Sequence, residues 1–132
     1  MRIIIDADSC PKIVLQYCLD LGQKLNVPVY TVADTSHEFA NSKNHIMVDS
    51  KKQESDIKIY NFAQKDDLII TKDSGLATLV LGKNVLCISP FGKVFKDSLT
   101  GNFKQNGFKK KHTPYSKNDF KDFVNTIKEN II

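Results

Sequence analysis

The sequence predicts an α/β fold of three layers, in which helices cover both faces of a mostly parallel, five-stranded sheet. Short apolar runs alternate along the chain with segments whose apolar residues recur at helical spacing. This alternation is typical of parallel strands that are joined by helical crossovers. The length of 132 residues fits one domain and leaves no room for a second independent core. We therefore expect a single domain over residues 1–132.

The first strand is expected at residues 2–6, because RIIID is short, rich in β-branched residues and followed by turn-forming residues. A helix should begin at about Pro11, since proline suits a first helical turn and Asp8 or Ser9 can cap it. The helix should end at Asn26. Its apolar residues recur at helical spacing and are expected to form a buried face: Ile13, Val14, Tyr17, Cys18, Leu21 and Leu25.

Four more strands and three more helices are expected in the rest of the chain. The strands are predicted at residues 28–33, 45–49, 67–71 and 84–89, and the helices at 54–64, 75–81 and 116–131. Ser116 and Asp119 stand three residues apart and resemble a capping box at the start of the last helix. The segment 91–115 is basic and less regular, and it lacks a clear period.

The composition is that of an ordinary globular protein, with 41% hydrophobic and 26% charged residues. No stretch approaches the roughly 20 apolar residues that a membrane-spanning helix needs, and the first apolar run is too short for a signal peptide. We therefore predict a cytoplasmic protein with no membrane partner. The cysteines Cys10, Cys18 and Cys87 are odd in number and lack metal-ligand spacing, which favours free thiols.

The net charge of +4 is unevenly distributed. Residues 1–92 hold 10 Lys and Arg against 11 Asp and Glu, whereas residues 93–132 hold 9 against 4. A near-neutral body with a basic tail suits a polyanionic partner. A solvated, lysine-rich surface explains so small an excess equally well, and both interpretations stay open.

Aspartates stand at the predicted ends of three strands. Asp6 and Asp8 follow the first strand, Asp49 ends the third, and Asp73 follows the fourth, while Asp56 lies about two helical turns beyond Asp49. Ligands of open parallel sheets bind outside the carboxyl ends of the strands, so these side chains are expected to meet at one edge. Aspartate also caps helices and builds turns, and a structural role for Asp8 as a cap stays open.

Carboxylates gathered in a partly desolvated cleft repel one another, and a bound cation removes that cost. Their hard oxygens favour Mg²⁺ or Mn²⁺. Such an ion lowers the pKa of water and stabilises a developing charge on a phosphoryl oxygen. The pattern therefore favours a metal-dependent phosphodiesterase.

Several motifs resemble the bacterial YaiI/YqxD family over nearly the whole chain. They are DADSCP (6–11), VD (48–49) with Asp56 seven residues on, and TKDSGLA (71–77), with looser matches in SPFGKVF (89–95) and PYSKNDF (114–120). That family is similar to PIN-like nucleases. The resemblance implies a PIN-like fold, a Mg²⁺ or Mn²⁺ site and RNA as substrate. The positions that match family acids, and so the implied metal ligands, are Asp6, Asp8, Asp49, Asp56 and Asp73, with Asp6, Asp49 and Asp73 as the catalytic core.

The chain departs from the family pattern at two arginines. Phe91 stands where relatives usually have the arginine of Pro-Arg-Gly, and Phe120 stands where they have the arginine of Asp-Arg. Substrate binding is then expected from Thr71 and from point charges at Lys109, Lys110 and Lys111, although lysine lacks the bidentate fork of arginine.

Other functions fit parts of the pattern. A phospho-receiver domain would use Asp6, Asp8, Asp49 and Thr71, but Ser89 stands where its lysine is expected, before Pro90. A phosphatase of the haloacid dehalogenase type would need an acidic pair after a later strand, and the chain is short for it. A non-catalytic nucleic-acid-binding module would use aromatic residues that lie among lysines, which can equally pack the tail onto the core: Phe91, Phe95, Phe103, Phe108 and Tyr115.

Overall fold

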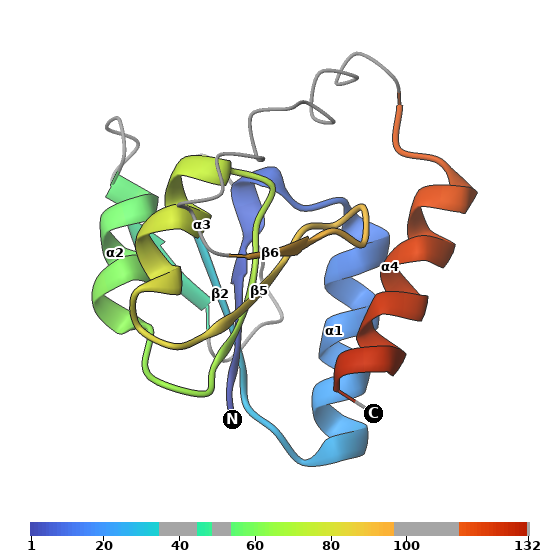
Figure 1. Ribbon diagram of the computed structural model, residues 1–132, viewed down its shortest axis with the longest axis horizontal. Coiled ribbons are helices and arrows are strands. Elements are labelled where there is room, and N and C mark those ends of the chain that lie inside the picture. Colours follow the sequence, from blue (N-terminus) through green and yellow to red (C-terminus); the bar gives the residue numbers. More distant parts are fainter. Residues whose placement is uncertain (35–44, 49–53, 97–113, 132) are drawn as a thin grey trace.

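The computed structural model describes residues 1–34, 45–48, 54–96 and 114–131, and shows a central sheet between two layers of helices (Figure 1). Helix α1 (Lys12–Leu25) and helix α4 (Lys117–Asn130) cover one face of the sheet. Helix α2 (Glu54–Phe62) and helix α3 (Ser74–Leu81) cover the other. The predicted α/β class with three layers is confirmed.

The sheet has the strand order β3-β2-β1-β4-β5-β6. Its five parallel strands match the predicted ones, and they are β1 (Ile3–Asp6), β2 (Val29–Asp34), β3 (His45–Val48), β4 (Leu68–Ile70) and β5 (Leu86–Ile88). A sixth strand, β6 (Val94–Phe95), pairs antiparallel with β5 at the edge. It was not predicted, because two residues are too few to show a period of two.

The sheet residues face the two helical layers alternately. Ile3 and Ile5 of β1 pack with α1 and α4, whereas Ile4, between them, packs with α2 and α3. All three side chains are 0% exposed. A strand that is buried on both faces must be apolar at every position, which explains the continuous run of isoleucine.

Two expectations about α1 are wrong. Its N-cap is Pro11, which makes no side-chain cap bond, and neither Asp8 nor Ser9 caps it. Those residues belong instead to a 3₁₀ turn, η1 (Ala7–Ser9), that separates β1 from α1. Ile13 and Leu25, which were expected on the buried face, are 50% and 37% exposed, because the sheet and α4 cover only the stripe centred on Val14, Cys18 and Leu21. Asn26 ends the helix in the left-handed conformation, as predicted.

The turn between β5 and β6 is fastened to α4. Thr126 Oγ1 donates a hydrogen bond to Gly92 O at 2.6 Å, and the Tyr115 hydroxyl donates one to Pro90 O at 2.6 Å. The predicted capping box of α4 is present, with Ser116 and Asp119 bonding reciprocally. These bonds fix where the C-terminal helix begins and how it meets the sheet.

Two further expectations concern the whole chain. Cys10, Cys18 and Cys87 are free thiols, as predicted, and burial raises the pKa of Cys18 and of Cys87 to about 12. In the described part of the chain, no helix is long and apolar enough to cross a membrane.

We predict that Gly92→Ala destabilises the protein by at least about 2 kcal/mol. Gly92 has φ +89°, which disfavours a side chain, and an added Cβ would lie 2.7 Å from Asp122 O of α4. Gly82→Ala is the matched control, since its φ is −66° and its nearest neighbour would be 3.6 Å away. Urea unfolding measures both, and equal stabilities of the two variants would contradict this account of the turn.

Candidate functional site

The candidate site lies where the strand order of the sheet reverses. Strand β1 has β2 on one side and β4 on the other, so the crossovers from β1 and from β4 leave in opposite directions along the sheet. In doubly wound sheets this switch point opens a crevice at the carboxyl ends of the strands. Asp6 is the last residue of β1, and Thr71 directly follows β4.

Asp6 is a buried carboxylate, with 5% of its surface exposed. Thr71 Oγ1 donates a hydrogen bond to Asp6 Oδ2 at 2.7 Å, and Ser9 Oγ donates one to the same oxygen at 3.2 Å. Among the described residues, no group donates a hydrogen bond to Asp6 Oδ1. A buried carboxylate oxygen without a donor is costly, and it is where a cation or a proton gains most.

The environment of Asp6 raises the pKa of its carboxyl from 3.8 to about 6. Burial is the largest cause, because it disfavours the charged form. The hydroxyl bonds from Thr71 and Ser9 oppose this shift, while the negative charges of Asp56 and Asp8 add to it. The aspartates are thus close enough to act on one another.

Asp73 has a structural role at the start of α3. Its Oδ1 accepts hydrogen bonds from Gly75 N at 2.9 Å and Leu76 N at 3.2 Å, which makes it the N-cap of the helix. Its own backbone N–H donates to Thr71 Oγ1 at 3.1 Å. The Thr71 hydroxyl therefore links Asp6 to Asp73, and the cap holds the Asp73 carboxylate in one orientation.

Asp56 and Asp8 complete the described part of the cluster. The pKa of Asp56 is raised, first by burial, and then by the charge of Asp73, by a carboxyl–carboxylate hydrogen bond with Asp73 and by the charge of Asp8. Asp8 is exposed, and its Oδ2 accepts a hydrogen bond from Ser55 Oγ at 3.1 Å. A bond between residues 8 and 55 ties the turn after β1 to the first turn of α2.

The structure thus brings together four of the predicted ligands, Asp6, Asp8, Asp56 and Asp73, with Thr71 between them. Asp49 and the lysines Lys109, Lys110 and Lys111 lie outside the described residues. Among the residues described, no three Asp, Glu, His or Cys side chains converge closely enough to hold a metal ion by themselves. Ser9 and Ser55, which donate hydrogen bonds to Asp6 and Asp8, were not predicted as site residues, because a serine in a polar turn carries no signal of its partner.

The two positions where family arginines are expected contribute packing in this chain. The Phe91 ring lies 5.4 Å from the Tyr115 ring, and the Phe120 ring contacts Tyr17 edge-on at 5.8 Å. Positive charge near the site must come from elsewhere. Lys72, between Thr71 and Asp73, is exposed at this edge, as is Lys93 at the end of the turn after β5.

The topology argues against the phospho-receiver interpretation. Receiver domains have the flavodoxin-like strand order, in which β1 lies between β2 and β3. Here β1 lies between β2 and β4, and β3 is at the edge. The acidic pair after β1 therefore faces the loop after β4, which carries Thr71 and Asp73, and this arrangement is not that of a phosphoacceptor site.

Comparisons with known proteins agree with the motifs. A family model described as "Uncharacterized BCR, YaiI/YqxD family" matches residues 4–132. A UPF0178 protein of Heliobacterium modesticaldum is 44% identical over 95 residues, which are 72% of this chain and 64% of that protein. UPF0178 proteins of Natranaerobius thermophilus and Bacillus cytotoxicus are 33% and 32% identical, with matches that cover 100% and 97% of this chain and 97% and 91% of theirs. The chain thus spans just under two thirds of the first relative's length and nearly all of the other two. No solved structure matches the chain significantly.

We predict that Thr71→Val costs about 1–3 kcal/mol of stability and raises the pKa of Asp6 above about 6. The variant removes the hydroxyl that donates to Asp6 and accepts from Asp73 N, so the buried Asp6 carboxylate keeps the longer bond from Ser9 and the Asp73 N–H loses its bond to Thr71. Thr71→Ser keeps the hydroxyl and is the control. Urea unfolding and a carboxyl-carbon NMR titration measure the two effects, and identical titration of Asp6 in both variants would contradict the assigned bond.

We predict that Asp6→Asn stabilises the metal-free protein above pH 6, by at most about 3 kcal/mol, and has little effect below pH 4. The native carboxyl holds its proton up to a pH of about 6 and the unfolded one only to 3.8, so wild-type stability falls as pH rises through that window and stays lower above it. Asn keeps an oxygen for Thr71 and has no charge to lose. Thermal unfolding from pH 3 to pH 8 checks this, with Asp20→Asn on the exposed side of α1 as control. A constant difference in stability at all pH values would show that folding does not raise the pKa of the Asp6 carboxyl.

Proposed function

The chain belongs to the YaiI/YqxD family, as its motifs predicted, and from the geometry at the switch point we propose that it is a Mg²⁺- or Mn²⁺-dependent phosphodiesterase, a PIN-like ribonuclease. The observation that carries the proposal is the buried Asp6 carboxylate, whose Oδ1 lacks a donor among the described residues and on which the negative charges of Asp56 and Asp8 act. Such a buried charge does not stabilise the fold, since a neutral residue would pack there at a lower desolvation cost, and a charge of this kind is typical of functional sites.

The donor set fits a small, hard cation. Carboxylates of Asp6, Asp56 and Asp73 offer oxygen ligands from three different elements, and Asp8 and Asp49 would assist. Mg²⁺ is usually bound by only one or two carboxylates, by several waters and by substrate phosphates. A site without three convergent side chains among the described residues agrees with an ion that is completed by water and substrate. When bound, the ion would supply Lewis acidity and lower the pKa of a coordinated water.

The residues of the chain would hold and orient the reacting groups. The Thr71 hydroxyl bonds both the Asp6 carboxylate and the backbone N–H of Asp73, and so limits how far the two residues can move apart. The α3 cap occupies Asp73 Oδ1, so the carboxylate that interacts with Asp56 is held in one orientation. Because one oxygen of each aspartate is used by the fold, the other is held in place before a substrate arrives, and this lowers the cost of ordering the site.

RNA is proposed as the substrate from the resemblance to PIN-like nucleases and from the basic residues. Lys72 and Lys93 are exposed at the edge of the sheet that carries the aspartates, and Lys109, Lys110 and Lys111 add charge in the same half of the chain. Lysines bind phosphates as point charges and do not read base sequence. Affinity for RNA should therefore fall steeply with salt.

We predict that Mn²⁺ binds wild-type protein saturably and fails to bind the Asp6→Asn/Asp73→Asn double variant. Asn at position 73 still accepts hydrogen bonds at the N-cap, so α3 should persist and the loss should reflect the missing charges. Isothermal calorimetry measures binding, and circular dichroism checks the fold. Asp20→Asn/Asp122→Asn, which removes two exposed charges far from Asp6 in the sequence, is the matched control.

The same variants test catalysis. Wild-type protein should cleave single-stranded RNA in the presence of Mn²⁺, and EDTA should stop the cleavage. The Asp6→Asn/Asp73→Asn double variant should cleave at a rate at least about 100-fold lower. RNA binding that survives EDTA and the double variant, with no cleavage in wild type, would favour the non-catalytic binding module. Absence of both Mn²⁺ binding and cleavage in wild type, with and without RNA, would overturn the proposal.

A further inference from the structure

An aromatic pair lies at the same edge of the sheet as the aspartates. The rings of Phe91 and Tyr115 are 5.4 Å apart and tilted by 54°, and both side chains are only partly buried. Phe95, the other described residue among the aromatics that lie among lysines in the segment 91–115, is 2% exposed and belongs to the core. The structure thus separates a packing aromatic from two that keep part of their surface open.

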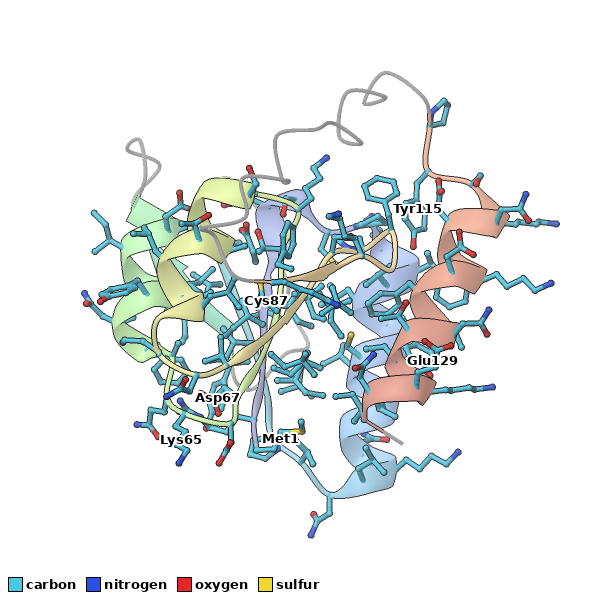
Figure 2. All side chains as sticks on the ribbon, viewed as in Figure 1. Met1, Lys65, Asp67, Cys87, Tyr115 and Glu129 are labelled. Atoms are coloured by element: carbon cyan, nitrogen blue, oxygen red, sulfur yellow. The ribbon has the colours of Figure 1, made fainter. Side chains whose placement is uncertain are left out.

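The pair is close to the aspartate cluster. Phe91 belongs to the turn that follows β5, and β5 is separated from β1 by β4 alone. Adjacent strands are about 4.8 Å apart, so the end of β5, where this turn begins, is about 10 Å from the end of β1. Tyr115 packs against the same core cluster as Cys10, four residues after Asp6. Figure 2 shows Tyr115 at the end of the molecule opposite Asp67, which is at the amino end of β4.

The turn does not need the Phe91 ring to stay in place. Thr126 Oγ1 bonds Gly92 O, and Tyr115 Oη bonds Pro90 O, both at 2.6 Å. Within the turn, the Ser89 hydroxyl accepts hydrogen bonds from the backbone N–H groups of Phe91 and Lys93, each at 3.1 Å. Hydroxyls bonded to backbone therefore fix the turn, and the ring is presented from a rigid support.

The surroundings of the pair are complementary to a nucleotide. Lys93 is exposed two residues after Phe91, and Lys72 is exposed in the loop after β4, between the pair and Asp6 in strand order. Flat apolar rings stack on bases of any sequence, while lysines follow the phosphates. An amphipathic peptide would instead need a longer apolar groove than one pair of rings.

We propose that Phe91 and Tyr115 form a stacking subsite for an unpaired base, at the same edge of the sheet as the aspartates that would act on the phosphodiester. The inference rests on the proposed function and names its substrate class, which is single-stranded nucleic acid. A base inside a duplex already stacks on its neighbours and cannot cover the rings without unpairing. The subsite therefore makes the protein select single strands without reading their sequence.

The test measures binding of a short, fluorescein-labelled single-stranded RNA of mixed sequence by polarisation, in EDTA so that no cleavage occurs. Phe91→Leu keeps an apolar side chain but loses the ring face, and should weaken binding about 10-fold, within the range known for one stacked base. Phe91→Trp should bind as tightly as wild type or more tightly. Phe120→Leu, which removes a ring that packs on Tyr17, is the matched control and should bind as wild type does.

Further measurements separate this subsite from the proposed function. Mn²⁺ binding of Phe91→Leu should equal that of wild type, and its thermal unfolding should show that it is folded. Unchanged RNA affinity in Phe91→Leu would overturn the subsite, even if wild type cleaves RNA. Phe91-dependent binding of RNA by a wild type that cleaves nothing would support the subsite and overturn the phosphodiesterase. Equal loss of single-stranded and duplex RNA binding in Phe91→Leu would also count against stacking, because duplex binding depends on phosphates alone.

Discussion

The hydrogen bond from Thr71 to Asp6 is the interaction on which the organisation of this site depends. It joins the ends of β1 and β4, the two neighbouring strands between which the chain reverses its winding. Parallel strands bring their carboxyl ends to one edge, but they do not by themselves orient the side chains that follow. The Thr71 hydroxyl does so, since it donates to Asp6 and accepts from the backbone of Asp73 at the start of α3.

The two ends of the sheet differ in their electrostatics. In the part of the chain that the structure describes, the ion pair lies between Arg2 and Asp67, at the amino ends of the strands, where Arg2 also covers the Phe62 ring. At the carboxyl ends, burial raises the pKa values of Asp6 and Asp56, and the negative charges of neighbouring aspartates raise them further, Asp56 and Asp8 acting on Asp6 and Asp73 and Asp8 acting on Asp56. One end of the sheet is thus built for stability and the other retains charge at the expense of stability, which is typical of a functional edge.

Phe91 and Phe120, which stand where the family motifs predict arginines, have different surroundings. Phe120 contacts Tyr17 edge-on and packs against the core between α1 and α4. Phe91 stays at the strand edge on a turn that is held by Ser89 and Thr126. The family motifs predict an arginine at this position and the chain has an apolar ring there, so the positive charges described near this edge are those of Lys72 and Lys93.

The sequence by itself determined the alternation of strands and helices and the parallel sheet, because a strand that is buried on both faces must be continuously apolar and a covering helix must be amphipathic. It also determined that Asp6 and Asp73 follow the carboxyl ends of strands and so belong to one edge of the sheet. That β1 and β4 are neighbours was decided by the tertiary structure. Only the tertiary structure decided which face of α1 is covered, so Ile13 and Leu25 were wrongly expected to be buried. It alone decided that Asp8 bonds Ser55 rather than caps α1, and that Phe91 meets Tyr115. Such pairings depend on distances between residues far apart in the chain, which hydrophobic period and local propensity do not encode.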